Sequence, residues 1–235
     1  MLHLAEGAGL LPTGDVTGQL PMAVVFVDLS RFTPLTAAMG DLAAAHVLHR
    51  FSDLVREAVG RWGGRVVKQI GDAFLLVFPE PRSAVASALE IERRAAAEEQ
   101  FPAVRSGIDW GRVLHREGDY VGSVVNTAAR LAAQAERHQV LVTAAVRDES
   151  TGLADTEFAP LGTRQLKGLV EPLELFEARR VDGARRQRKA VDPVCGMELG
   201  EDEAPARLSL GGKDRAFCSE ACLRQFMAAP ERYQV

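Results

Sequence analysis

The feature that most constrains the fold is the run Met22–Leu29, which is apolar apart from Asp28 near its end. A continuous apolar run of this length, rather than an alternating one, is typical of a strand buried on both faces. Such a strand belongs inside a large core. The chain has 235 residues, 47% hydrophobic and 26% charged, which suffices for one large globular domain and a small second one.

Further patterns predict helices and strands around this run. Asp41–Val59 carries apolar residues at helical spacing and is followed by Gly60, a typical helix stop. The apolar runs Arg65–Ile70 and Ala73–Phe78 are joined by Gly71 and Asp72, which predicts a hairpin. Also predicted are helices over Pro81–Gln100 and Val124–Arg137 and strands over Ala103–Asp109, Arg112–His115, Gln139–Thr143, Phe158–Pro160 and Leu173–Ala178. This order favours an α+β fold with helices packed on one face of a mixed sheet.

Changes in composition divide the chain into four parts. Residues 1–20 form a lead-in without a sustained period, and residues 21–178 form the main domain. Residues 179–190 hold six cations and one acid, which predicts a solvated basic linker; a contact with nucleic acid or acidic lipid is the alternative. Residues 191–235 form a compact segment that contains every cysteine. The net charge of −4 gives no support to a general nucleic-acid binder.

The chain carries no pattern for a membrane or for secretion. Its longest uninterrupted apolar candidate, Met22–Val27, is far shorter than the roughly 18 residues that a membrane-spanning helix needs. The first basic residue is Arg31, so a positively charged signal region is missing. Three cysteines gathered at one end do not resemble a disulfide scaffold. We therefore expect a cytoplasmic protein.

Four polar residues stand at positions where chemistry is plausible. Asp28 ends a buried strand, Asp72 lies at a hairpin tip, and Asn126 and Arg130 are four residues apart, on one face of a predicted helix. Each has an ordinary structural explanation: a turn or cap for the acids and for Asn126, and a solvated surface cation for Arg130. Their combination is what points to a site.

Four segments resemble the catalytic domain of class III nucleotidyl cyclases. VVFVDLSRFTPL, VVKQIGDAFLLVF, GDYVGSVVNTAARL and LKGLVEPLELFE occur in the order and at the spacing of that family, over about residues 21–178. The resemblance implies a ferredoxin-like α+β domain that works as a head-to-tail homodimer with active sites at the interface. One departure is the short segment before Asp119, RVLHREG, which in many relatives is longer and grips the partner subunit.

The resemblance also implies a role for each matching residue. Asp28 and Asp72 match two aspartates that bind a pair of Mg²⁺ or Mn²⁺ ions, for which carboxylate oxygens are suitable ligands. Lys68 and Asp119 match the pair that selects the base; a lysine donating to adenine N1 and an aspartate accepting from its amino group would refuse guanine. The other matches are Asn126 for orienting the ribose, Arg130 for the charge at the α-phosphate and Lys167 for the triphosphate, although an exposed loop lysine explains Lys167 almost equally well.

The implied function is that of an adenylate cyclase converting ATP to 3′,5′-cyclic AMP and pyrophosphate. The alternatives are a guanylate cyclase, which Lys68 and Asp119 oppose, and a catalytically silent dimeric sensor of nucleotide or metal. All six core positions carry functional residue types, which argues against the silent sensor.

The C-terminal segment contains Cys195, Cys218 and Cys222. A helix beginning near Ser219 would aim the sulfurs of Cys218 and Cys222 at Cys195, where three thiolates suit Zn²⁺ or Cu⁺; three small buried residues are the alternative. So short a segment folds poorly by core burial alone, which favours a metal. The strings VDPVCGMEL and FCSEACLRQFMAAPERY resemble a YHS domain, related to TRASH-type metal modules, which implies metal binding and a regulatory role. The fourth ligand stays open among Asp192, Met197, Glu220, water and another chain.

Overall fold

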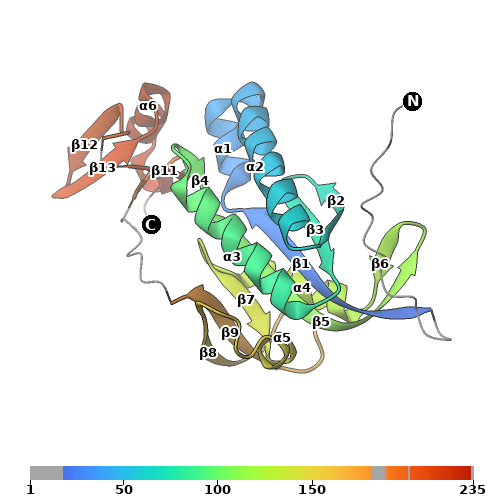
Figure 1. Cartoon of the computed structure of the whole chain (residues 1–235). Helices are drawn as coiled ribbons and strands as arrows, with labels where there is room; N and C mark the ends of the chain where they lie inside the picture. The colour runs from blue at the N-terminus through green and yellow to red at the C-terminus, as the bar shows by residue number, and fades with distance from the viewer. Residues whose placement is uncertain (1–17, 182–188, 201, 234–235) are drawn as a thin grey trace, which may run out of the picture.

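The computed structural model describes residues 18–181, 189–200 and 202–233. The predicted lead-in over residues 1–20 therefore lies almost wholly outside the described residues, as does most of the predicted basic linker over 179–190. Figure 1 shows a sheet covered by long helices and, beside the ends of α1 and β4, a smaller unit built from the residues after 189.

The main sheet is mixed, as the element order predicts. Its strand order is β2-β3-β1-β5-β7-β9-β8, and β6 pairs with β5. The central strand β1 pairs antiparallel with β3 and β5, whereas β5 and β7 are parallel. The bounds are β1 (Gln19–Leu29), β2 (Arg65–Ile70), β3 (Ala73–Phe78), β5 (Val104–Arg116), β6 (Asp119–Val121), β7 (Val140–Thr143), β8 (Thr156–Arg164) and β9 (Leu173–Arg180).

Strand β1 is buried on both faces, which confirms the interpretation of its apolar run. Val25 and Val27 belong to one hydrophobic cluster, while Met22 and Val24 belong to another. Successive side chains of a strand point to opposite faces. The two clusters therefore lie on opposite sides of the sheet.

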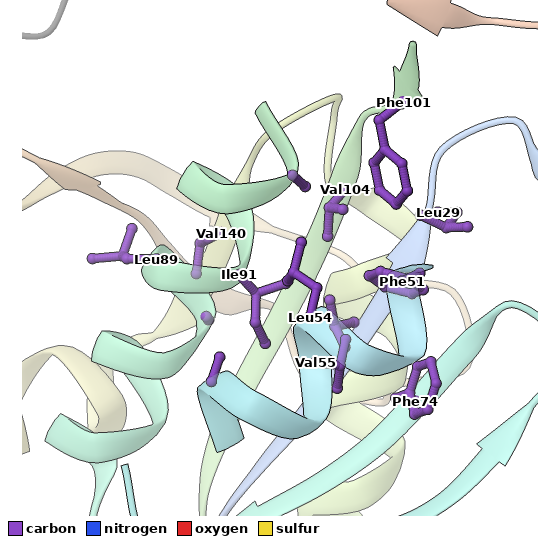
Figure 2. Close-up of a cluster of buried hydrophobic side chains, with 14 of the residues drawn as sticks. Leu29, Phe51, Leu54, Val55, Phe74, Leu89, Ile91, Phe101, Val104 and Val140 are labelled. Atoms are coloured by element: carbon purple, nitrogen blue, oxygen red, sulfur yellow. The ribbon is translucent and has the colours of Figure 1, made fainter. Parts of the chain in front are cut away.

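One face of the sheet is covered by α1 (Phe32–Met39), α2 (Asp41–Arg61) and α3 (Pro81–Ala97). Phe51 of α2 packs edge-on against Phe74 of β3 with ring centroids 5.4 Å apart, and 6.4 Å from the ring of Phe101. Figure 2 shows these rings together with the apolar side chains of α3. Pro81 stands at the first turn of α3, where its fixed φ and missing N–H suit a helix start.

The opposite face is covered by α4 (Ser123–Gln134), so the expectation of helices on one face only is wrong. Val124 and Ala128 of α4 belong to the same cluster as Met22 and Val24. The helix α4 can pack on this face because β5 has a glycine there: a Cβ atom at Gly107 would lie 2.2 Å from the backbone of α4. The missing side chain lets the helix approach the strand closely.

One further prediction for the main domain differs from the structure, and several short elements were not predicted. The strands expected over Ala103–Asp109 and Arg112–His115 are one strand, β5, because it stays paired with β1 from Val104 to Leu114. The helices α1 and α5 (Ala144–Glu149) and the short strand β6 were not predicted. The hairpin of β2 and β3 is confirmed, with Ile70 paired to Ala73 across Gly71 and Asp72.

The C-terminal segment packs against the main domain through a shared core and a shared sheet. It consists of β10 (Ala190–Val191), β11 (Met197–Leu199), β12 (Ala206–Leu210), β13 (Lys213–Phe217), α6 (Glu220–Ala228) and the 3₁₀ turn η1 (Pro230–Tyr233). Strand β11 pairs with β4 (Phe101–Pro102) of the main domain. Met197, Phe217 and Phe226 belong to the same buried cluster as Phe51 and Phe101.

Candidate functional site: two carboxylates, a lysine–aspartate pair and a cysteine cluster

Asp28 and Asp72 lie side by side where β1 ends and the β2–β3 hairpin turns. Asp28 pairs in register with Ala73, the residue after Asp72, so the end of β1 meets the tip of the β2–β3 hairpin. Gly71 allows the tight turn by adopting a φ of 63°. Burial, followed by the negative charge of Asp28 and a hydrogen bond with it, raises the pKa of Asp72 to about 6. The two acids therefore share one partly buried site.

Arg105 is a third member of this site that sequence reasoning missed. It stands directly opposite Asp28 on β5, and its Nε and Nη2 donate to Asp28 Oδ2 at 3.0 and 2.6 Å. The available signal was a cation near the start of a predicted strand. It gains meaning only once the β1–β5 register places it against the acid.

The oxygen ligands at this site suit hard divalent cations. Two carboxylates supply oxygen ligands, and burial, followed by repulsion from the negative charge of Asp28, raises the pKa of Asp72 even though Arg105 is close by. A divalent ion would relieve this repulsion.

Lys68 and Asp119, 51 residues apart in the chain, are brought into a direct ion pair. The hydrogen bond from Lys68, together with the backbone N–H of Tyr120, lowers the pKa of Asp119. A register shift in β2 immediately precedes Lys68, and Arg65 donates to the Tyr120 hydroxyl at 2.6 Å, which ties β2 to β6. The two residues expected to act together are therefore adjacent.

Asn126 and Arg130 lie one turn apart on α4, and both are exposed. Within residues 18–181, 189–200 and 202–233, neither side chain makes a hydrogen bond or an ion pair. A side-chain carbon at Gly168 would lie 3.8 Å from Arg130 Nη2, so the loop that carries Lys167 runs beside Arg130. No described contact joins Asn126, Arg130 or Lys167 to Asp28 and Asp72 of the same chain.

The three cysteines form one buried cluster. The sulfur of Cys218 lies 3.5 Å from that of Cys195 and 3.7 Å from that of Cys222. As predicted, a helix begins here: Ser219 caps α6 by accepting a hydrogen bond from the backbone of Cys222. Hydrogen bonds from Cys195 and Cys218 lower the pKa of Cys222, whereas hydrogen bonds with the other two cysteines raise the pKa of Cys195.

Asp192 completes the cysteine cluster. Its Oδ1 accepts from the backbone of Val194 at 2.8 Å and of Cys195 at 3.3 Å, and its Oδ2 accepts from the backbone of Cys218 at 2.8 Å. Ligand atoms of Asp192 and of all three cysteines lie within 4.8 Å of one another. Asp192 therefore fixes two of the cysteine backbones and stands within reach of anything bound between the sulfurs.

Comparison with known proteins places this arrangement in a family. The model of the adenylate and guanylate cyclase catalytic domain matches residues 17–176. The chain belongs to this family. The model of the YHS domain matches residues 190–235, C-terminal to the cyclase domain. Both resemblances stated from the sequence are confirmed.

Individual relatives of this cyclase-domain protein are similar over the same region. An adenylate cyclase of Glutamicibacter nicotianae is 41% identical over 56% of the chain and 34% of its own length. An adenylate cyclase of Streptomyces coelicolor is 36% identical over 63% of the chain and 39% of its own length. The chain thus spans less than half the length of these relatives. A solved adenylate cyclase structure from Trypanosoma brucei, 23% identical, has a TM-score of 0.64 over 69% of the chain and 89% of its own, which shows the fold.

Among the described residues, the structure contains no helix that combines the length and the apolar character needed to span a bilayer.

Proposed function

We propose that the chain is an adenylate cyclase that converts ATP to 3′,5′-cyclic AMP and pyrophosphate in a homodimer. In the reaction, the ribose 3′-oxygen bonds to the α-phosphorus, the bond from that phosphorus to the pyrophosphate oxygen breaks, and the hydroxyl proton leaves to solvent. The observation that carries the proposal is the ion pair of Lys68 and Asp119, which pre-forms a donor and an acceptor matched to adenine.

Asp28 and Asp72 are the proposed ligands of two divalent ions, Mg²⁺ or Mn²⁺. Such ions would neutralise charge on the triphosphate and favour ionisation of the attacking hydroxyl. Arg105 holds one oxygen of Asp28 and adds a positive charge beside the place where the triphosphate would lie. These partly buried residues would bind and orient the phosphates through electrostatic contacts.

The remaining residues support the homodimer. Asn126 and Arg130 face outward from α4 and have no partner within the described chain, which suits groups that act on a substrate held by a second copy. Asn126 would orient the ribose, Arg130 would meet the charge that develops at the α-phosphate, and Lys167 would bind the triphosphate. The short segment before Asp119, which is longer in many relatives and grips the partner subunit there, is part of a tight hairpin of β5 and β6 here. The homodimer would therefore form through surfaces other than this segment.

Turnover assays with ATP and GTP test the proposed activity and base choice. Asp72→Asn should reduce cyclic AMP formation by at least about a hundredfold, since removing one electrostatic contact to the transition state commonly costs this much. Asp53→Asn, on the exposed face of α2, is the matched control and should be unaffected. Lys68→Ala should lose the preference for ATP over GTP, whereas Lys213→Ala should keep it. Full turnover by Asp72→Asn would exclude its proposed role.

Mixing two inactive variants tests the shared site. Asp28→Ala and Arg130→Ala each damage one half of every site in their own homodimers. In a mixed dimer, one of the two sites would combine the intact halves. Recovery of activity on mixing supports the homodimer, and its absence in a mixture shown to form mixed dimers excludes it. A wild-type chain without turnover but with nucleotide binding would instead identify the silent sensor.

We also propose that Cys195, Cys218 and Cys222 bind Zn²⁺ or Cu⁺. Four ligands around Zn²⁺ with Zn–S bonds of about 2.3 Å hold their sulfurs about 3.8 Å apart, close to the 3.5 and 3.7 Å between these sulfurs. Asp192 is the nearest candidate for a fourth ligand. Titration with Zn²⁺ or Cu⁺ should protect all three thiols from alkylation, and Cys222→Ser should abolish this protection. Unprotected thiols at saturating metal would leave only the packing interpretation.

A further inference from the structure

Backbone pairing and ionic contacts form a joint between the C-terminal segment and the cyclase domain. Strands β4 and β11 pair through Pro102 and Met197, and through Phe101 and Glu198. The buried carboxylate of Glu198 accepts from Arg137 at 2.9 Å and lies 2.7 Å from His138 Nε2. Because backbone pairing and buried ionic contacts occur together, displacements in the C-terminal segment are transmitted to the main domain rather than absorbed by a loose linker.

Arg31 lies between this joint and the proposed metal ligand Asp28. It follows Asp28 by three residues, precedes α1, and adopts a left-handed backbone with φ 65° and ψ 33°. A residue other than glycine avoids this conformation unless its surroundings impose it, at a cost of about 1–3 kcal/mol. The backbone of Ser30 is tied to the carbonyl of Ala103 at 2.7 Å, so the segment after Asp28 is held from the other side as well.

The side chain of Arg31 rests on the loop that carries a cysteine. Its Nη2 donates to the carbonyl of Pro193 at 3.2 Å. A side-chain carbon at Gly196 would lie 3.1 Å from both Cβ and Cδ of Arg31, so the two residues touch. Cys195 lies between Pro193 and Gly196, and Asp192 anchors the start of the same loop. Contacts thus run from the loop of the cysteine cluster to Arg31, and the backbone leads from Arg31 to Asp28, three residues earlier.

We propose that Arg31 is a positioning residue that couples occupancy of the cysteine cluster by a soft or borderline cation to the geometry of Asp28. A cation bound by Cys195 and its two neighbours stiffens the loop of residues 192–196. The stiffened loop holds Arg31 in its left-handed conformation, and Asp28 is then kept in the arrangement that binds metal–ATP. Metal loading therefore lowers the KM for ATP and leaves kcat nearly unchanged. This inference rests on the proposed function.

The central variant is Arg31→Gly, because glycine adopts a left-handed backbone freely and the substitution removes only the side-chain contacts. Asp155→Gly is the matched control, since Asp155 also has a positive φ, of 53°, but lies in the loop before β8. Cys222→Ser supplies a full chain that cannot load the cluster. All proteins are kept reduced, and Zn²⁺ is the probe, added in one equivalent under excess Mg²⁺.

Kinetics give the first readout. Zn²⁺ should lower the KM for ATP of the wild type and of Asp155→Gly by about fivefold or more, within the usual range of coupling between two sites. Arg31→Gly should bind Zn²⁺ with unchanged affinity, yet its KM should change less than about twofold, because the coupling is removed. An equal response of Arg31→Gly and wild type overturns the proposal, as does a wild type whose KM ignores bound Zn²⁺.

Hydrogen exchange gives a second readout that does not depend on turnover. Zn²⁺ should slow amide exchange of residues 29–36 in the wild type, and should leave it unchanged in Arg31→Gly and Cys222→Ser. Slowed exchange in a chain that forms no cyclic AMP would refute the proposed activity while supporting the coupling. Two outcomes overturn the coupling: Zn²⁺ leaves the exchange of residues 29–36 in the wild type unchanged, or the wild type binds no Zn²⁺.

Discussion

Replacing Gly107 by alanine should damage catalysis by moving α4. The new carbon would lie 2.2 Å from the backbone nitrogen of Ala132 and 2.4 Å from the carbonyl oxygen of Ala128. Both atoms belong to the backbone of α4, so no side-chain rotation relieves the clash. The helix must shift away from β5, and Asn126 and Arg130 must shift with it.

The size of the effect follows from this geometry. Overpacking of a tight contact costs about 1–3 kcal/mol, and a backbone clash on two sides places Gly107→Ala at about 2–3 kcal/mol. For a chain of this size, each kcal/mol lowers the melting temperature by about 2–4 °C, which gives a loss of about 4–12 °C. A misplacement of reacting groups by about 1 Å costs about a hundredfold in rate. We expect kcat to fall by this amount.

Two other glycines serve as controls for Gly107→Ala. At Gly111 the new carbon would meet only a side-chain methyl of Val124 at 2.9 Å, so Gly111→Ala should cost less than Gly107→Ala. At Gly60, inside α2, no atom lies within 4 Å, and alanine should stabilise the helix by up to about 1 kcal/mol. Thermal unfolding and ATP turnover measure all three variants. A Gly107→Ala protein with wild-type melting temperature and kcat would refute the reasoning.

Three further predictions concern the joint and the core. Glu198→Ala leaves the partly exposed Arg137 and the largely buried His138 without this carboxylate and should cost about 3–5 kcal/mol, measured as a lower urea midpoint. Burial alone would lower the pKa of His138, but Glu198 and Glu92 raise it. Protonated His138 therefore stabilises the fold fully below about pH 6.5, and this stabilisation is lost as the pH rises through the raised pKa. Melting temperatures measured upward from pH 6 should fall more for the wild type than for His138→Gln, and parallel curves would contradict this. Phe51→Ala should cost about 3–5 kcal/mol in unfolding free energy.

The sequence predicted those parts of the fold in which local pattern and packing agree. The central strand, the hairpin at Gly71 and Asp72 and the helix α2 follow from apolar runs, a turn signal and helical spacing. The helix α1 has none of these signals: it carries a proline at its third position and begins after Arg31 with no side-chain cap. Burial of Leu35 in the core favours the helix there, and that contact is not local.

Glycines in β5 explain the largest error in the predicted architecture. In a sequence, Gly107 and Gly111 indicate a weak or broken strand, because glycine lowers strand propensity. In the structure they are the places where α4 approaches the sheet. Which helix needs that space depends on a contact between β5 and a segment about twenty residues further on, which no local pattern contains.

The candidate site divides in a similar way. Their positions at a strand end and a hairpin tip brought out Asp28 and Asp72, and the family resemblance brought out Lys68 and Asp119. The structure places each pair together, although the roles assigned to them stay predictions. Arg105 was missed since its meaning depends on strand register. The contacts of Arg31 and Glu198 join segments 60 or more residues apart, and they could be found only in three dimensions.

The pairing of β4 with β11 has a practical consequence for truncation. Phe101 belongs to one buried cluster with Met197, Phe217 and Phe226. Truncation after β9 would therefore expose a hydrophobic surface on the remaining cyclase domain. Altered turnover in a shortened protein would therefore reflect this exposed apolar surface as much as the loss of regulation by metal. Single substitutions in the intact polypeptide separate the two effects.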